Sequence, residues 1–476
     1  MARTWRWLSY VLLVGFLLPV YLVTLGQTVG TADTFEFQVV VPRLGIVHPT
    51  GYPLYLLLSK PFTLIPFNSV AWRVNLATAV FGLTAVCLLY LLCWRLTNWP
   101  LTSLLAAVIF GLTPTFWSQA IEAEVYTLHS LLVVAALLLM REIGDWRLEA
   151  KIHLPANSNP NLAGSQLISD SQTSNSNIRS NRPSKANLTT DTNPAARNPP
   201  LHPYTLTLLL SFTLGLGLTN HLTTIILLPA AVLTVILAYR TGRYSGSPYH
   251  GLKAALLIAL AFILPLLLYA YLPIRWAAVN GEPMGLARFV NWIIGGRFQG
   301  ALQLTAWLED STRYDIVGRL FADEWLTIWT LILVIVGAAY LLLWQWRYGL
   351  LLLIIWFGFA SYALNYYVPD LAVFIIPAQL IMAIWWLVGI VAALDLVLAN
   401  RGVRQLANRG VRQTFLIEAL FLMAGIIPLL AATADLVPNQ VNRSQEEEAV
   451  RWAKAVFELP LDENAAILAD SEQLPG

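Results

Sequence analysis

The chain has 476 residues, of which 57% are hydrophobic and only 12% are charged, and its formal net charge is +2. Soluble domains carry about a quarter of charged residues, so this composition and the mean hydropathy of +0.63 exclude a soluble globular protein and indicate a multi-span membrane protein. The near-neutral charge, without a basic block, argues against a nucleic-acid partner. Cys87 and Cys93 are interpreted as small apolar residues, because no C-x-x-C pattern or dense histidine cluster predicts a disulfide or a structural metal site.

Apolar runs of spanning length recur along the chain and predict an all-α polytopic membrane protein with about eleven transmembrane helices. The first run begins near residue 7 and is about twenty residues long, which is nearer to a spanning helix than to the core of a cleaved signal peptide, the alternative interpretation. The stretch 50–66 is apolar but short and proline-rich, and it is interpreted as an interfacial or re-entrant helix. The predicted spans are 7–27, 72–93, 101–118, 125–141, 203–219, 222–239, 252–274, 326–345, 348–366, 371–396 and 414–433.

The distribution of charge predicts the topology. With the N-terminus in the cytoplasm, most Lys and Arg residues fall on the cytoplasmic side and most acidic residues fall outside, as the positive-inside rule requires. A Ser- and Asn-rich linker and the absence of a disulfide framework favour a bacterial cytoplasmic membrane. The predicted organisation is an N-terminal membrane block 1–141 with a first outer loop 28–71, a cytoplasmic linker 142–202, a C-terminal membrane block 203–433 with an outer loop 275–325, and an extracytoplasmic tail 434–476.

Three segments outside the spans have their own signatures. Residues 152–201 are rich in Ser, Asn, Thr and Pro with almost no large apolar residues, which predicts a disordered part of the linker. Residues 398–413 are a tandem copy of eight residues, interpreted as a slipped duplication in a basic cytoplasmic loop, with lipid-headgroup contact as the alternative. A short helix outside the membrane is predicted near 446–457.

Polar residues of unusual type gather on the predicted outer face. Asp33 and Glu36 lie in the first outer loop and are three residues apart, so they share a face on a helical turn. Two carboxylates on one face are the minimum for a general base with a helper, or for a divalent ion. The other candidates, which come from several separate outer junctions, are His48, Tyr52, Arg73, Asn75, Glu124, Tyr126, His129, Asn220, His221, Arg275 and Asp370.

Each candidate also has a purely structural interpretation. The acidic pair could be solvated loop charges, His48 a turn residue, and Asn220 with its neighbour a pair of helix caps. His129 lies within a predicted span, where ionisable groups are costly and usually functional, although a hydrogen-bonded structural histidine remains open. Arg73 and Arg275 could be interfacial anchors. The convergence of six outer junctions on one compartment favours a functional site.

Three motifs resemble a family of membrane proteins that was once known only as a domain of unknown function and that includes protein O-mannosyltransferases. The first combines Asp33-x-x-Glu36 with Leu-Gly-Ile-Val-His48-Pro-Thr-Gly-Tyr52-Pro-Leu-Tyr and Arg73-Val-Asn75. The others are Glu124-Val-Tyr126-x-Leu-His129 and Gly215-Leu-Gly-Leu-Thr-Asn220-His221. The resemblance covers roughly residues 25–225, and Tyr-Leu-Pro before Arg275 and Val-Pro-Asp370 match more loosely.

The resemblance implies a GT-C glycosyltransferase with a catalytic carboxylate in its first outer loop. Asp33 would be the general base and Glu36 its nearest partner, in a transfer that inverts the anomeric centre. The implied partners are a polyprenyl-phosphate donor of mannose or another hexose, an extracytoplasmic protein or glycan acceptor, and the bilayer. A departing phosphate needs cations, for which Arg73, His221 and Arg275 are candidates.

Two questions stay open at this level. The cofactor is unknown, since either none is required or a divalent cation is used, and no metal ligand is assigned. The alternatives to a transferase are a transporter or flippase of a lipid-linked substrate and a non-catalytic membrane scaffold. Transporters place polar groups near the midplane and often show inverted repeats, whereas here the polar cluster lies at one face and both acidic residues are present.

Overall fold

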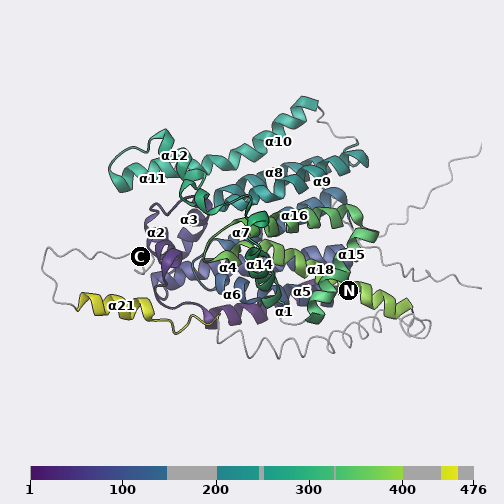
Figure 1. Ribbon diagram of the computed structural model, residues 1–476, viewed down its shortest axis with the longest axis horizontal. Coiled ribbons are helices and arrows are strands. Elements are labelled where there is room, and N and C mark those ends of the chain that lie inside the picture. Colours follow the sequence, from purple (N-terminus) through teal and green to yellow (C-terminus); the bar gives the residue numbers. More distant parts are fainter. Residues whose placement is uncertain (1, 147–200, 246–250, 326–327, 400–440, 459–476) are drawn as a thin grey trace, which may run out of the picture.

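The computed structural model describes residues 2–146, 201–245, 251–325, 328–399 and 441–458 (Figure 1). The linker 152–201, the duplicated stretch 398–413 and the predicted span 414–433 lie almost entirely outside the described residues. Within them the elements are helical, apart from an isolated bridge between Leu302 and Tyr366. The elements are α1 (Ala2–Thr24), α2 (Ala32–Arg43), α3 (Pro53–Ser59), η1 (Lys60–Leu64), α4 (Val70–Thr97), α5 (Pro100–Gly111), α6 (Pro114–Ala120), α7 (Tyr126–Gly144), α8 (Pro203–Asn220), η3 (Leu222–Leu227), α9 (Leu228–Arg240), α10 (Gly251–Leu266), η4 (Leu267–Ala270), α11 (Tyr271–Asn280), α12 (Leu286–Ile293), η5 (Gly296–Ala301), α13 (Ala306–Glu309), α14 (Thr312–Asp323), α15 (Ile328–Trp344), α16 (Trp346–Asn365), α17 (Leu371–Phe374), α18 (Ile376–Ala399) and α21 (Glu448–Phe457).

The described helices confirm a polytopic membrane protein but not the count of eleven spans. Seven helical stretches are long and apolar enough to cross a membrane, and the bent pair α5–α6 makes up to eight. The predicted spans 203–219 and 326–345 coincide with α8 and the 17-residue α15, which are not among the seven. The predicted stretch 50–66 contains the short helices α3 and η1, as expected of a segment that does not span.

The predicted span 101–118 consists of two helices, α5 and α6, that meet at an angle of 72°. Pro114 starts α6, and a proline disfavours helical conformation in the residue before it. The first N–H groups of α6 lack partners within their own helix. The Glu324 carboxylate is the acceptor for one of them, the backbone N–H of Thr115 (3.1 Å), and it also accepts a hydrogen bond from the Thr115 hydroxyl. Burial raises the pKa of Glu324 to about 7, although the hydrogen bonds from Thr115 lower it.

Close helix packing forms the interior of the bundle. α4 packs against α1, α5 and α7, while α15 lies along α18 and α8 along α10. Gly337 of α15 and Gly389 of α18 let the two backbones approach, since a Cβ on either would clash with a carbonyl oxygen of the other helix. The most apolar window of α18 is 89% buried, whereas that of the α10–α11 stretch is only 17% buried, so α10 lies at the lipid-facing side of the bundle (Figure 1).

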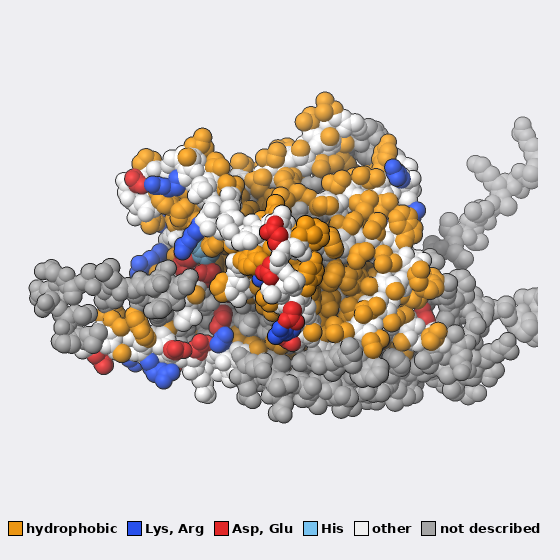
Figure 2. Space-filling model, in the orientation of Figure 1, with side chains coloured by type: hydrophobic (Ala, Val, Ile, Leu, Met, Phe, Trp, Pro, Cys, Tyr) orange, Lys and Arg blue, Asp and Glu red, His pale blue; other side chains and the backbone are white. Residues whose placement is uncertain are grey.

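One end of the bundle carries most of the short elements. α2, α3, α11, α12 and α21 lie at the left end of Figure 1. Figure 2 shows apolar side chains over the body of the molecule, while acidic and basic side chains gather towards that end and on α14. Arg313 of α14 is buried and donates hydrogen bonds to the carbonyl oxygens of Ala363, Leu364 and Tyr366 at the end of α16. The predicted outer loop 275–325 is therefore largely helical and tied to the bundle.

Candidate active site

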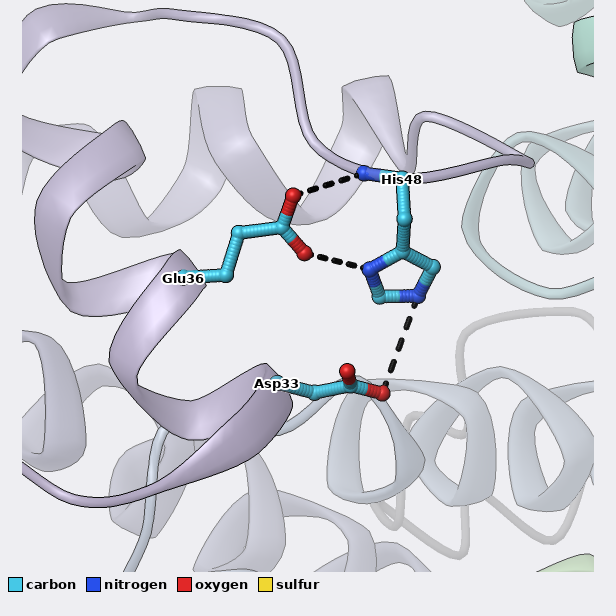
Figure 3. A group of neighbouring side chains, drawn as sticks. All are labelled: Asp33, Glu36 and His48. Atoms are coloured by element: carbon cyan, nitrogen blue, oxygen red, sulfur yellow. Dashed lines mark hydrogen bonds and ion pairs between the residues drawn. The ribbon is translucent and has the colours of Figure 1, made fainter. Parts of the chain in front are cut away.

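The acidic pair lies at the start of α2, the helix that follows the first span. Asp33 is in the first turn of α2, where the helix dipole favours a negative charge, and Glu36 lies one turn further along. α2 ends at Arg43, and the next residue, Leu44, has a left-handed φ of 50° that reverses the direction of the chain. As a result His48, in the loop after α2, faces both carboxylates (Figure 3).

Glu36 holds His48 at two points. Its carboxylate accepts a hydrogen bond from the backbone N–H of His48 at 2.9 Å and contacts the Nδ1 atom at 2.5 Å. The other ring nitrogen, Nε2, lies 3.7 Å from an Asp33 carboxylate oxygen. Burial alone lowers the pKa of His48, but the hydrogen bond to Glu36 and the charges of Asp33 and Glu36 outweigh it and raise the pKa above its usual value. The imidazole therefore bridges the two carboxylates, with one nitrogen directed at each.

Two further carboxyl groups face this cluster from other elements. Glu124, between α6 and α7, accepts a hydrogen bond from the Thr34 hydroxyl at 3.2 Å. Burial raises the pKa of Glu124 well above its usual value, and the charge of Asp33 adds to the shift. Asp370, before α17, likewise has a pKa raised by burial and by Asp33. The structure thus brings together acidic residues that are far apart in the sequence.

Aromatic rings lead from the cluster into the bundle. The Tyr52 ring lies 5.2 Å from the His48 ring and 6.4 Å from the His221 ring, measured between centroids. The His221 ring lies 5.4 Å from Tyr126 and 4.9 Å from His129. These residues, all predicted from sequence as candidates, form one continuous series of ring contacts, in which Tyr126, His129 and His221 are buried. Planar aromatic rings are suited to stacking against other planar or apolar groups.

The deeper histidines are held by hydrogen bonds to η3. The Nδ1 atom of His221 lies 2.7 Å from the Thr223 hydroxyl, which also lies 3.2 Å from Nε2 of His129. Asn220 donates to the backbone oxygen of Val125 at 3.2 Å, which joins the end of α8 to the start of α7. Asn220 therefore links α8 to α7, and the Thr223 hydroxyl links His221 to His129.

Asn75 and Arg73, at the start of α4, are occupied by the first outer loop. Asn75 is buried, accepts a hydrogen bond from Gln38 of α2 at 2.9 Å and donates one to the backbone oxygen of Gly26 at 2.9 Å. Arg73 donates to the backbone oxygens of Thr63, Ser69 and Asn68. Both side chains thus hold α2 and η1 in place against α4. They lie beside Asp33, Glu36 and His48, which we call the acidic cluster, and are not part of it.

Arg275 of α11 is likewise occupied by backbone. It donates hydrogen bonds to the carbonyl oxygens of Leu44 at 2.5 Å and Arg43 at 3.1 Å. Its charge lies at the C-terminus of α2, where the helix dipole favours a cation.

Arg297 and Phe298 are site residues that the sequence reasoning missed. They lie in η5, after Gly295, whose left-handed φ of 64° turns the chain towards the cluster. The Phe298 ring is 6.0 Å from the His48 ring, and the charge of Arg297 lowers the pKa of His48. Arg297 is exposed and makes no hydrogen bond or ion pair among the described residues. No motif in the 275–325 segment signalled it; only the double glycine before it marks a turn.

The cluster also has the composition of a cation site. Asp33, Glu36 and His48 each offer a ligand atom, and these atoms lie within 4.8 Å of one another. Carboxylate oxygens and an imidazole nitrogen are ligands for divalent ions such as Mn²⁺ or Zn²⁺. A histidine that binds a metal through Nε2 commonly donates its Nδ1–H to a carboxylate, and Glu36 is placed to accept it. The same contacts are satisfied by a protonated His48 alone.

The segment 441–446, which we name the C-terminal strap, packs against the first outer loop. The Arg443 backbone N–H donates to the Thr24 carbonyl oxygen at 3.1 Å, and the Thr28 hydroxyl donates to the backbone oxygen of Glu446 at 2.8 Å. The Arg443 guanidinium lies 2.8 Å from a Glu122 carboxylate oxygen. The strap leads to α21, where the sequence predicted a helix near 446–457.

An all-helical membrane bundle with this arrangement has the fold of the GT-C glycosyltransferases. The apo oligosaccharyltransferase of Archaeoglobus fulgidus aligns with a TM-score of 0.51 and 12% sequence identity, over 96% of this chain and 58% of that one. ArnT from Cupriavidus metallidurans, solved bound to undecaprenyl phosphate, aligns with a TM-score of 0.44 and 14% identity, over 91% of this chain and 74% of that one.

The sequence comparisons name a narrower relationship for the N-terminal part. Residues 33–153 match the family model of the protein O-mannosyl-transferase TMEM260 N-terminal domain. The mouse protein O-mannosyl-transferase TMEM260 is 40% identical over 115 residues, which is 24% of this chain and 16% of that protein. The Dictyostelium discoideum protein of the same name is 31% identical over 136 residues, 28% of this chain and 16% of that protein. The matched region contains α2, the His48 loop, α4 and the Glu124 junction.

Proposed function

We propose that this protein is an inverting glycosyltransferase that moves mannose or another hexose from a polyprenyl-phosphate donor to a protein or glycan acceptor. The observation that carries the proposal is the position of Asp33. Its carboxylate stands at the polar end of a GT-C membrane bundle, is 54% exposed, and lies in the segment that is similar to the O-mannosyl-transferases. The proposed setting is a bacterial cytoplasmic membrane, with the N-terminus in the cytoplasm and the site outside.

In the proposed reaction the acceptor hydroxyl attacks the anomeric carbon of the donor sugar from the face opposite the phosphate. The new carbon–oxygen bond forms as the bond to the phosphate oxygen breaks, which inverts the anomeric centre. Asp33 accepts the hydroxyl proton, a contribution on the order of a hundred- to ten-thousand-fold in rate for a well-placed base. The polyprenyl phosphate leaves with an additional negative charge.

The leaving phosphate requires a cation close to the sugar, and Arg297 has the strongest structural support for that role. Its charge reaches His48, and its guanidinium has no partner among the described residues. The hydrogen-bond donors of Arg73 and Arg275 are engaged by backbone oxygens. The partly exposed ring of Tyr52, which lies beside His48, would contact the sugar or the first isoprene units.

The test is sugar transfer by the purified protein in lipid nanodiscs. A mannosyl-phosphopolyprenol donor is incubated with candidate acceptor proteins, and the product is identified by mass spectrometry. We expect Asp33→Asn to reduce transfer by about a hundredfold or more without changing thermal stability. The matched control is Asp315→Asn, which removes an exposed carboxylate paired with Arg319 on α14.

Two results would contradict the proposal. Full activity of the Asp33→Asn protein would remove Asp33 from the chemistry. Exchange of a lipid-linked sugar across a proteoliposome membrane, without any glycosylated product, would instead support the transporter or flippase alternative.

A further inference from the structure

An apolar face of α12 lies beside the site and stays largely exposed in the part of the chain that the structure describes. α12 carries Leu286, Phe289, Val290 and Ile293 at helical spacing, and Ile294 continues the stripe. No residue of α12 is buried, and Leu286 is 77% and Val290 46% exposed. Such a spacing puts these five apolar side chains on one side, and Arg288, Asn291 and Trp292 on the other.

The preceding helix shows what this face meets. The stretch Gly251–Asn280 is 30 residues long and only 17% of its apolar window is buried among the described residues, so most of the surface of this stretch faces lipid. At 1.5 Å per residue it measures about 45 Å, whereas the hydrocarbon core of a bilayer is about 30 Å thick. The end of α11 therefore reaches the headgroup level, and α12 follows after five residues.

The residues around the turn have the composition of a membrane interface. The rings of Trp276 and Trp292 pack edge to face with centroids 5.1 Å apart. The Arg288 guanidinium lies 5.0 Å from the Trp276 ring and pairs with Glu282. Tryptophan and arginine are enriched where a protein passes from acyl chains to headgroups.

We propose that residues 271–294, the interface hairpin, bind the bilayer surface on the site side, with the apolar face of α12 inserted at the boundary between headgroups and acyl chains. The occupant is the lipid leaflet itself, because the face continues a helix that is already lipid-facing. α12 thereby acts as an anchor that lies in the membrane plane rather than as part of the soluble outer region.

The interface hairpin also supports the loop that carries His48. The Tyr271 hydroxyl donates to the backbone oxygen of Gly45 at 2.7 Å, and Trp292 Nε1 donates to that of Val47 at 3.2 Å. Leu272 packs directly against Gly51, where a Cβ would lie 2.6 Å from it. Since Arg275 also holds the end of α2, every one of these supports of the His48 loop comes from the hairpin. The leaflet consequently fixes the height at which the acidic cluster stands above the membrane.

The insertion is tested by spin labels on the full-length protein in nanodiscs of phosphatidylethanolamine and phosphatidylglycerol. Single cysteines replace Val290 on the apolar face and, as the matched control, Asn291 on the opposite face, with Cys87 and Cys93 changed to alanine. We expect the label at 290 to collide mainly with oxygen, which concentrates in acyl chains, and the label at 291 mainly with a water-soluble nickel chelate.

Three outcomes of this measurement would overturn the proposal. Equal nickel access at both positions would place α12 in water. Oxygen access at 290 that appears only after addition of polyprenyl phosphate would assign the face to the lipid tail of a substrate. Spin–spin broadening at 290 would assign it to a second copy of the chain.

The support of the loop is tested through transfer activity, and this arm alone rests on the proposed glycosyltransferase function. Val290→Asp introduces a charge into the inserted face, and we expect transfer to fall about tenfold or more through displacement of the His48 loop. Asn291→Asp adds the same charge on the water-facing side and should retain transfer within about twofold. Equal activity of the two variants would refute the coupling. If the unmodified protein shows no transfer at all, the proposed function fails while the spin-label result still decides the membrane anchor.

Discussion

His48 offers a pair of substitutions that separate its two contacts. Asparagine places an amide nitrogen near the position of Nδ1 and can keep the contact with Glu36, but nothing remains opposite Asp33. Glutamine reaches the position of Nε2 and can keep a donor towards Asp33. If His48 acts by orienting and polarising Asp33, glutamine should retain more activity than asparagine.

The size of the effect follows from the geometry. A charge pair 3.7 Å apart has a Coulomb energy of about 4 kcal/mol at an effective dielectric constant of about 20. Solvent screens much of this, because the Asp33 carboxylate is half exposed, and about 1.5–3 kcal/mol is a reasonable remainder. We therefore expect kcat to fall about 10- to 100-fold in His48→Asn and about 10-fold or less in His48→Gln, since 1.4 kcal/mol corresponds to tenfold.

The assay measures kcat and KM for the mannosyl-phosphopolyprenol donor separately, and thermal unfolding verifies that both variants are folded. A positioning residue should change kcat while KM for the donor stays within about twofold. The reasoning is refuted if both variants keep full kcat, or if asparagine outperforms glutamine. It is also refuted if chelation abolishes wild-type transfer, Mn²⁺ restores it, and the His48 variants need far more Mn²⁺, because His48 would then be a metal ligand.

Three further predictions concern the surrounding structure. Arg313→Ala leaves three carbonyl oxygens at the end of α16 without their donor and should cost about 3–5 kcal/mol, seen as a lower unfolding temperature, whereas Arg319→Ala on the exposed side of the same helix should cost less than about 0.5 kcal/mol. Burial raises the pKa of Glu324 to about 7, so this carboxyl group binds more protons in the folded than in the unfolded protein, and its contribution to stability should decline as pH rises from about 5 to about 8. Glu324→Gln should flatten that decline, whereas an unchanged pH profile of unfolding would contradict the raised pKa of Glu324. At Gly51 an added Cβ would be strained by the left-handed φ of 83° and would clash with Leu272, so Gly51→Ala should lower stability by about 1–2 kcal/mol and reduce transfer. Gly281 has a φ of 71° and open space around it, so Gly281→Ala should carry only the backbone cost of about 1 kcal/mol. Equal effects of the two substitutions would refute the role of crowding at Gly51.

The sequence was sufficient for features that depend on local spacing. The three-residue separation of Asp33 and Glu36 predicted a shared helix face, and both lie on α2 directed at one side chain. The apolar runs predicted most of the long helices, because a helix needs about 20 consecutive apolar residues to cross the hydrocarbon core of a bilayer. The kink at Pro114 was recoverable in principle, since a proline inside an apolar run often ends a helix.

Contacts between distant segments could not be predicted. Asn75 binds Gln38, and backbone oxygens occupy Arg73 and Arg275. These contacts depend on the paths of the loops in space, which the spacing of residues in the sequence does not predict. Glu124 and Asp370, which are far from Asp33 in the sequence, come close enough for its charge to affect them only because the helices pack as they do. The residue types on the outer face were therefore predictable, but the division between those that line the site and those that support it was not.

The C-terminal strap has a consequence for the order in which the fold forms. Thr24 and Thr28 precede α2, whereas their partners Arg443 and Glu446 follow α18 in the chain. Contacts of such long sequence separation close late in folding. The first outer loop, and with it the acidic cluster, would stay loosely held until the strap has been synthesised and has docked, so the site would acquire its geometry only after α18 has formed.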